Sequence, residues 1–159
     1  MDWKKCRKKA YEVAFVRADE GKVYNTARAG QVYNYLEDVA EDVKEGAFVC
    51  RGVVGELYVV PRAKVEMGYD VDPESIGDEW VTARAKAGAA TYFCRKPEGA
   101  FALATEYGVM KGNREGVAHG EGDWILTTAK ETEAGLAPDE ADEWIVNGVV
   151  FARTYEIIE

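Results

Sequence analysis

The chain has 159 residues, of which 47% are hydrophobic and 11% aromatic, and this is enough to bury a globular core. Its formal net charge of −9 at pH 7 disfavours non-specific binding to nucleic acid or to an anionic membrane, and it favours a partner with a basic surface. No window approaches the roughly 18 apolar residues of a membrane-spanning helix, and the three cysteines lack any CxxC spacing. We therefore expect a cytoplasmic protein without a disulfide framework or a zinc site.

Two halves of the sequence share residues in the same order. The first matches lie 77 residues apart, as Trp3 and Trp80 do, and the next lie 78 apart, as Phe15 and Phe93 do. This ordered similarity predicts an internal duplication, and its alternative is coincidence between two alanine-rich and glycine-rich halves. The predicted ranges are 1–71 for the first unit, 72–78 for a linker and the start of a helix, and 79–159 for the second unit.

The predicted fold class is α+β, with two duplicated small β-rich units of antiparallel hairpins or half-barrels, each preceded by a short helix. The first helix covers residues 2–9. Its basic run from Lys4 to Lys9 is interpreted as a solvated face, with a phosphate contact as the alternative. In the second helix, Asp72 is a plausible N-cap, Pro73 takes the first helical position, and apolar residues follow at helical spacing.

Alternating apolar residues predict the strands that come next. Tyr11, Val13 and Phe15 alternate along one strand, and residues 91–96 repeat the pattern. A glycine turn after each strand leads to a second strand, so we expect one hairpin in each unit. The predicted strands are 11–18, 22–26, 48–53, 57–60 and 64–71 in the first unit and 91–96, 100–105, 124–128 and 149–158 in the second.

Two segments concentrate negative charge. Residues 34–44 place apolar residues at helical spacing and predict a short acidic helix, whereas their counterpart 111–120 is predicted to be a loop. The second unit carries an acidic insertion at 130–145, where a helical turn is expected after Pro138. The candidate partner-binding residues are Glu37, Asp38, Glu41 and Asp42 in the first segment and Glu131, Glu133, Asp139, Glu140, Asp142, Glu143 and Trp144 in the second.

Several short motifs together resemble a small phage and prophage family, the PGDYG-type domain. They are the lysine-rich start, the block 105–112, the glycine-aspartate-aromatic turn 122–124, the Gly-Glu-x-Tyr strand 55–58 and the Phe-x-x-Thr-Tyr-Glu end at 151–156. The first unit has Ala47 where the second has Asp123, and the second has no clear match to 55–58. The resemblance implies no established catalytic activity.

The search for catalytic groups is mostly negative. His119 is the only histidine, which excludes a site with several histidine ligands. A Cys94–His119 dyad is possible in principle, and Asp123 with Glu121 could act as acid and base, although an aspartate after a turn glycine more often bonds its own backbone. The glycine-rich stretch 108–122 lacks the P-loop and dinucleotide-binding patterns. We predict no cofactor and no metal.

Three classes of function follow from these observations. The first is a non-catalytic, phage-derived inhibitor that presents its acidic surface to a host protein with a basic nucleic-acid-binding surface, as anti-CRISPR and anti-restriction proteins do. The second is a small-ligand, for example nucleotide, binding protein with its site near His119, Gly122, Asp123 and Trp124. The third is a small hydrolase that uses Asp123 or His119.

Overall fold

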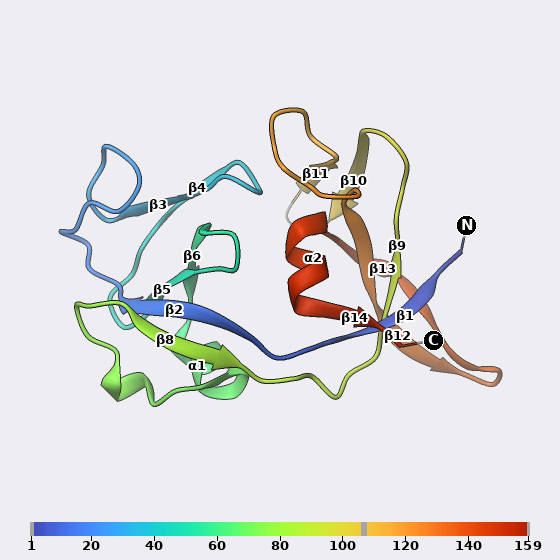
Figure 1. The fold of residues 1–159 in the computed structure, drawn as a ribbon, viewed down its shortest axis with the longest axis horizontal. Coiled ribbons are helices and arrows are strands. Elements are labelled where there is room, and N and C mark those ends of the chain that lie inside the picture. The colour runs from blue at the N-terminus through green and yellow to red at the C-terminus, as the bar shows by residue number, and fades with distance from the viewer. Residues whose placement is uncertain (1, 106–107, 159) are drawn as a thin grey trace. The chain divides into compact units, whose positions relative to one another are not determined.

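The structure of the protein is a computed structural model that describes residues 2–105 and 108–158. Glu106 and Tyr107, which belong to the motif 105–112, lie outside the described residues. The chain divides into two units, of which unit 1 comprises Met1–Lys9 and Ala87–Glu159 and unit 2 comprises Ala10–Lys86 (Figure 1). The described residues are mostly in antiparallel strands with two short α-helices, in agreement with a β-rich α+β class.

Unit 2 is built from the elements β2 (Tyr11–Arg17), β3 (Gln31–Asn34), β4 (Val39–Asp42), β5 (Phe48–Arg51), β6 (Leu57–Val60), α1 (Arg62–Gly68), β7 (Tyr69–Asp70), a 3-10 turn (Pro73–Ser75) and β8 (Val81–Ala85). The main sheet has the order β6-β5-β2-β8-β7. Its central strand β2 is buried on both faces, because Phe15 enters one core cluster and Val16 the other. Helix α1 adds Val65 to the first cluster, while Val32 of β3 belongs to the second.

Unit 1 is built from the elements β1 (Lys4–Lys8), β9 (Tyr92–Arg95), β10 (Phe101–Thr105), β11 (Gly108–Gly112), β12 (Trp124–Thr132), β13 (Gly135–Val146), α2 (Gly148–Thr154) and β14 (Tyr155–Ile157). Its main sheet has the order β13-β12-β9-β1-β14. The buried cluster of this unit contains Cys6, Cys94, Leu126, Phe151 and Tyr155, which come from β1, β9, β12, α2 and β14.

The N-terminal strand belongs to a different unit from the strand that follows it. β1 lies between β9 and β14 of unit 1, whereas β2, two residues further along, is the centre of the sheet in unit 2. β8 lies between β2 and β7 in the corresponding place in unit 2. The chain thus passes between units at Lys9–Ala10 and again at Lys86–Ala87. These boundaries differ from the predicted ranges 1–71 and 79–159.

The two predicted opening helices are wrong. Residues 4–8 and 81–85 are strands, each paired with a strand on both sides. Ala83 and Ala85 are buried at a spacing of two residues, and sheet pairing overrides the helical tendency of their alanine-rich surroundings. Asp72 does act as a cap, since its Oδ1 accepts a hydrogen bond from the Glu74 N–H at 3.0 Å, but it starts only a single 3-10 turn.

Residues 34–44 do not form the predicted acidic helix. They form most of the β3–β4 hairpin, whose turn contains Asp38 in a left-handed conformation (φ 54°). Residues 22–26 are not a strand either, and β10 pairs with β11 rather than with β9. The predicted loop 111–120 begins as the end of β11. The strand predicted at 57–60 is present with these bounds, and those predicted at 11–18, 48–53, 91–96, 100–105 and 124–128 are present with shifted ends.

The predicted closing strands 64–71 and 149–158 begin instead with the helices α1 and α2. Asn147 caps α2, because its Oδ1 accepts hydrogen bonds from the N–H groups of Val149 and Val150 at 2.9 and 3.2 Å. The helical turn predicted after Pro138 is also wrong, since this segment lies within β13. In the described part of the chain, no helix is long and apolar enough to cross a membrane.

Candidate functional site

The acidic insertion of the sequence forms the outer part of the β12–β13 hairpin (Figure 1), and the register of this hairpin shifts between Thr127 and Ala129. Thr127 pairs with Glu143 and Ala129 pairs with Pro138, so one residue of β12 faces the four residues 139–142 of β13. The buried Thr127 hydroxyl donates to the carbonyl oxygens of Asp139 and Asp142, the latter at 2.9 Å. These hydrogen bonds hold the main chain of residues 139–142 against β12. We call residues 139–142 the acidic bulge.

The carboxylates of the insertion differ in their surroundings. Glu131, Glu133, Glu140 and Asp142 are exposed, and Asp139 is half-buried. The remaining two candidate residues belong to the fold rather than to the surface. Glu143 forms an ion pair with Arg95 at 3.5 Å, and the Trp144 ring packs edge-on against Tyr92 with its centroid 5.9 Å away.

The acidic residues of the β3–β4 hairpin are partly engaged in unit 2. Asp38 accepts a hydrogen bond from the Tyr33 hydroxyl at 2.7 Å, and Glu41 accepts one from the Val59 N–H at 3.0 Å. Glu37 lies in the turn, where desolvation and the nearby charge of Glu41 raise its pKa. Asp42 is exposed. Some carboxylates of this hairpin are therefore exposed, whereas others accept hydrogen bonds that stabilise unit 2.

Glu56 of the Gly-Glu-x-Tyr motif is a buried carboxyl that shapes the β5–β6 turn. Its Oε1 accepts a hydrogen bond from the Val54 N–H at 3.2 Å, and its side chain fills the space that a Cβ on Gly52 would need. Burial raises the pKa of Glu56, and the charge of Glu37 adds to the effect. The motif thus has a structural explanation within the turn.

We expect Glu56→Gln to weaken the pH dependence of unit 2 stability. A raised carboxyl pKa means that the folded state binds the proton more tightly than the unfolded state, so the free energy of unfolding falls as pH rises from about 4.5, the ordinary value, through the raised pKa. Glutamine keeps the acceptor and carries no charge. Urea unfolding across this window should show a smaller decline for Glu56→Gln than for wild type, whereas the exposed control Glu12→Gln should retain the full decline.

Asp123 ties together three loops of unit 1. Its Oδ2 accepts a hydrogen bond from the Asn113 N–H at 2.8 Å and its Oδ1 accepts one from the Gly148 N–H at 2.9 Å, while its own N–H donates to Asn113 Oδ1 at 2.7 Å. The Asn113 side-chain amide donates in turn to the carbonyl of Gly99 at 2.7 Å. The carboxylate is buried and occupied by donors from other segments, not by its own backbone as the sequence suggested.

The glycines around Asp123 are required by this close packing. Gly122 has a φ of 122°, and a Cβ on Gly148 would collide with the carbonyl oxygens of His119 and Gly122. The His119 backbone carbonyl accepts a hydrogen bond from Gly122, and its side-chain Nδ1 is buried without a hydrogen-bond partner among the described residues. The glycine-aspartate-aromatic turn is therefore a structural clamp.

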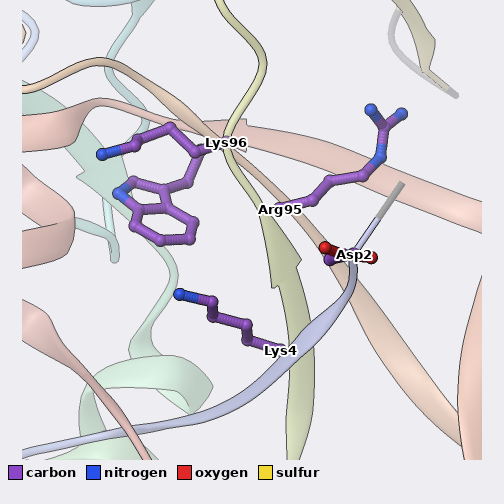
Figure 2. Close-up of a pocket in the computed structure, with 5 residues that line it drawn as sticks. Asp2, Lys4, Arg95 and Lys96 are labelled. Atoms are coloured by element: carbon purple, nitrogen blue, oxygen red, sulfur yellow. The ribbon is translucent and has the colours of Figure 1, made fainter.

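A pocket of about 330 Å³ opens beside Trp124, and four further residues line it: Asp2, Lys4, Arg95 and Lys96. Lys96 Nζ lies 5.4 Å from the centre of the Trp124 ring. In Figure 2 the side chains of Lys4 and Lys96 extend to the same side, while Arg95 turns away from them. The pocket therefore offers two ammonium groups and an indole to a ligand.

A search of protein-family models, of curated proteins and of solved structures found no match to this chain. The site must therefore be judged from its own chemistry. Within the described residues, no three His, Cys, Asp or Glu side chains gather where they could hold a metal ion. The structure places Cys94 against Cys6 in the core of unit 1.

The structure brings only some of the candidate residues together. Gly122 and Asp123 meet in the clamp, and Trp124 lines the pocket next to it. Sequence reasoning missed Lys96 as a pocket residue and named Lys4 only through the alternative of a phosphate contact. The two lysines are 92 positions apart. Only the pairing of β1 with β9 brings them to one place, and no local pattern in the sequence reports it.

Proposed function

We propose that the protein is a non-catalytic, phage-derived binding protein that presents carboxylates to the basic nucleic-acid-binding surface of a host defence protein, in the cytoplasm of the host cell. The acidic bulge is the observation that supports this proposal most directly. Its exposed Glu140 and Asp142 lie on a backbone that Thr127 holds in place. Binding of a partner would therefore cost little conformational entropy for ordering the backbone that carries these two side chains.

Exposed carboxylates can compete with nucleic acid for a basic protein surface. A protein channel that binds nucleic acid is lined by lysine and arginine, and carboxylates at its entrance replace phosphates as partners for those cations. Such contacts between exposed charges weaken with salt, because the Debye length is about 8 Å at physiological ionic strength. The protein has the required sign of charge, with a formal net charge of −9. The chemistry is that of anti-CRISPR and anti-restriction inhibitors.

The proposal is tested by substituting Glu140→Ser and Asp142→Ser together. Fluorescent DNA bound to a restriction endonuclease or to a CRISPR effector is titrated with each protein, and displacement is followed by anisotropy. We expect wild type to displace the DNA less well as salt increases, and the double variant to lose at least about tenfold in apparent affinity, which corresponds to about 1.4 kcal/mol.

The matched control removes the same charge elsewhere. Glu20→Ser with Glu98→Ser changes two exposed turn residues, one in each unit, and should displace DNA as wild type does. Equal losses in both double variants would mean that net charge alone acts and that the acidic bulge is not the contact surface. The proposed function would be contradicted if wild type displaced DNA from neither the restriction endonuclease nor the CRISPR effector. It would also be contradicted if displacement did not depend on the salt concentration.

The pocket beside Trp124 favours a second candidate function, the binding of a small anionic ligand with an aromatic ring, such as a nucleotide. Its volume of about 330 Å³ lies at the lower end of the range for ligand sites. The Lys4 and Lys96 ammonium groups suit phosphate oxygens, and the Trp124 ring suits a base.

A thermal-shift titration with ATP and with inorganic pyrophosphate tests this candidate. A ligand at 100 times its dissociation constant stabilises the protein by about 2.7 kcal/mol. We expect Lys4→Ala and Lys96→Ala each to remove the shift, and the exposed Lys130→Ala, also in unit 1, to keep it. If the thermal shift survived both pocket substitutions, the ligand would bind elsewhere. If neither compound shifted the unfolding temperature, nucleotide binding would be excluded as a function.

We also propose that the two units are copies of one ancestral module whose first strands have been exchanged. The residues that match at a separation of 77 lie in or next to β1 and β8, and each of these strands lies in the sheet of the opposite half. In both units a seven-residue helix leads directly into a short strand that pairs with the exchanged one, as α1 leads into β7 and α2 into β14. The resemblance to the PGDYG-type domain is part of the same proposal.

A further inference from the structure

Cys6 and Cys94 are neighbours in the core of unit 1, although 88 positions separate them in the sequence. In the pairing of β1 with β9, Lys4 lies opposite Cys94 and Cys6 lies opposite Tyr92. The two cysteines are therefore diagonal neighbours on one face of the sheet. Both are fully buried, with exposed fractions of 0%, and the Cys6 and Cys94 thiols share a hydrogen bond.

We propose that Cys6 and Cys94 are a disulfide-forming pair that can fasten residues 2–9 to the sheet of unit 1. Both side chains lie in one buried cluster, and a disulfide between these diagonal positions requires β1 and β9 to move closer together. Cys50 has a different environment. It lies in the core of unit 2, where its thiol donates to the Tyr58 hydroxyl at 3.2 Å.

The reaction needs an oxidant, and a small-molecule disulfide such as oxidised glutathione supplies it. One protein thiolate attacks a glutathione sulfur, forms a mixed disulfide and releases one glutathione thiolate. The second protein thiolate then displaces the other glutathione and forms the Cys6–Cys94 bond. Two protein thiols lose two protons and two electrons, and one oxidised glutathione becomes two reduced molecules.

Burial determines when this exchange takes place. The contact with Cys94 and desolvation raise the pKa of the Cys6 thiol far above its ordinary value, so almost no thiolate forms while the strand is paired. Exchange therefore requires β1 to open. The rate of exchange reports how often residues 2–9 leave unit 1, and the finished disulfide prevents them from leaving. Because this segment also carries Asp2 and Lys4, oxidation keeps the pocket beside Trp124 intact.

The experiment treats the reduced full-length protein with oxidised glutathione under native conditions, quenches with acid, alkylates the remaining thiols in denaturant and maps the peptides. We expect a single intramolecular disulfide that links Cys6 to Cys94, with Cys50 alkylated. Its formation should accelerate in urea below the unfolding midpoint. The product should unfold at a higher urea concentration than the reduced protein, and dithiothreitol should reverse this shift.

The same oxidation in concentrated guanidinium chloride is the control. In an unfolded chain the shorter loops favour pairing with Cys50, so the product distribution should change. Cys6→Ala should abolish the native product and Cys50→Ala should retain it. If a variant fails to fold, the peptide map of the wild type still decides. Three alkylated thiols after prolonged treatment, a native disulfide that includes Cys50, or a bond formed only between two chains would overturn the proposal.

Discussion

Deletion of residues 2–9 is expected to unfold unit 1 while unit 2 stays folded. β1 lies inside the sheet of unit 1, paired with β9 on one side and with β14 on the other. Further hydrogen bonds join this segment to the C-terminal region, from the Lys9 N–H to the Thr154 carbonyl and from the Ile158 N–H to the Lys5 carbonyl, both at 3.1 Å. Removing it leaves two sheet edges unpaired and opens the core at Cys6.

The expected loss is comparable to the whole stability of the unit. A domain of this size is stable by only about 5–10 kcal/mol, and each buried hydrogen bond contributes about 1 kcal/mol. The deletion removes the ladders of β1 with β9 and with β14, three further backbone hydrogen bonds and the buried Cys6 side chain. Residues 10–86 supply every strand of unit 2, so their fold does not need the deleted segment.

Hydrogen exchange measured by mass spectrometry checks this prediction. Amide protection in β9, β12 and β14 should vanish in the deletion variant, and protection in β2, β5 and β8 should match the wild type. A synthetic peptide of residues 2–9 added in excess should restore protection in unit 1. Unchanged protection in β9 would mean that β1 does not complete this sheet, and would contradict the strand exchange.

Asp123→Ala is expected to lower the free energy of unfolding of unit 1 by about 3 kcal/mol. The substitution removes a buried carboxylate that accepts hydrogen bonds from the N–H groups of Asn113 and Gly148, and both donors are left without this partner. Hydrogen bonds to a charged group contribute about 1.5–3 kcal/mol each, and part of this is recovered as water enters. Asp123→Asn keeps one acceptor and should cost less.

Urea unfolding monitored by the fluorescence of Trp124 and Trp144 in unit 1 measures this loss. Glu121→Ala is the matched control, because Glu121 is an exposed carboxylate in the same turn and its removal should change the free energy by less than about 0.5 kcal/mol. If Asp123→Ala unfolded as wild type does, the clamp would contribute no stability, and a role for Asp123 in ligand binding or catalysis would regain weight.

The strands that could be predicted are those whose own sequence shows which residues are buried. Tyr11–Arg17 and Leu57–Val60 carry the alternation or the apolar run that a strand in a sheet requires, and both are close to their predicted bounds. β1 could not be found in this way. Its sequence Lys-Lys-Cys-Arg-Lys has one apolar residue, and its conformation comes from β9 and β14, which lie more than 80 positions away.

The acidic segments show a similar division. Their charge and the extra length of the second one were evident in the sequence, but the helices predicted for them do not form. Charge spacing carries no information about the opposite strand. Residues 139–142 bulge because the register shifts between the pairs Thr127–Glu143 and Ala129–Pro138. Glu143 and Trp144 were expected at the partner surface, yet they lie where β13 alternates toward Arg95 and Tyr92.

The place of β1 between β9 and β14 has a consequence for the order in which the units are completed during synthesis. The ribosome produces residues 4–8 before the strands that flank them, which end at residues 95 and 157. At a synthesis rate of about 5–20 residues per second, this basic segment waits roughly 7–30 s for its second neighbour. Unit 2 has all its strands once residue 85 has emerged. The strands of unit 2 are therefore complete before those of unit 1, and the sheet of unit 1 is completed only when β14 pairs with β1.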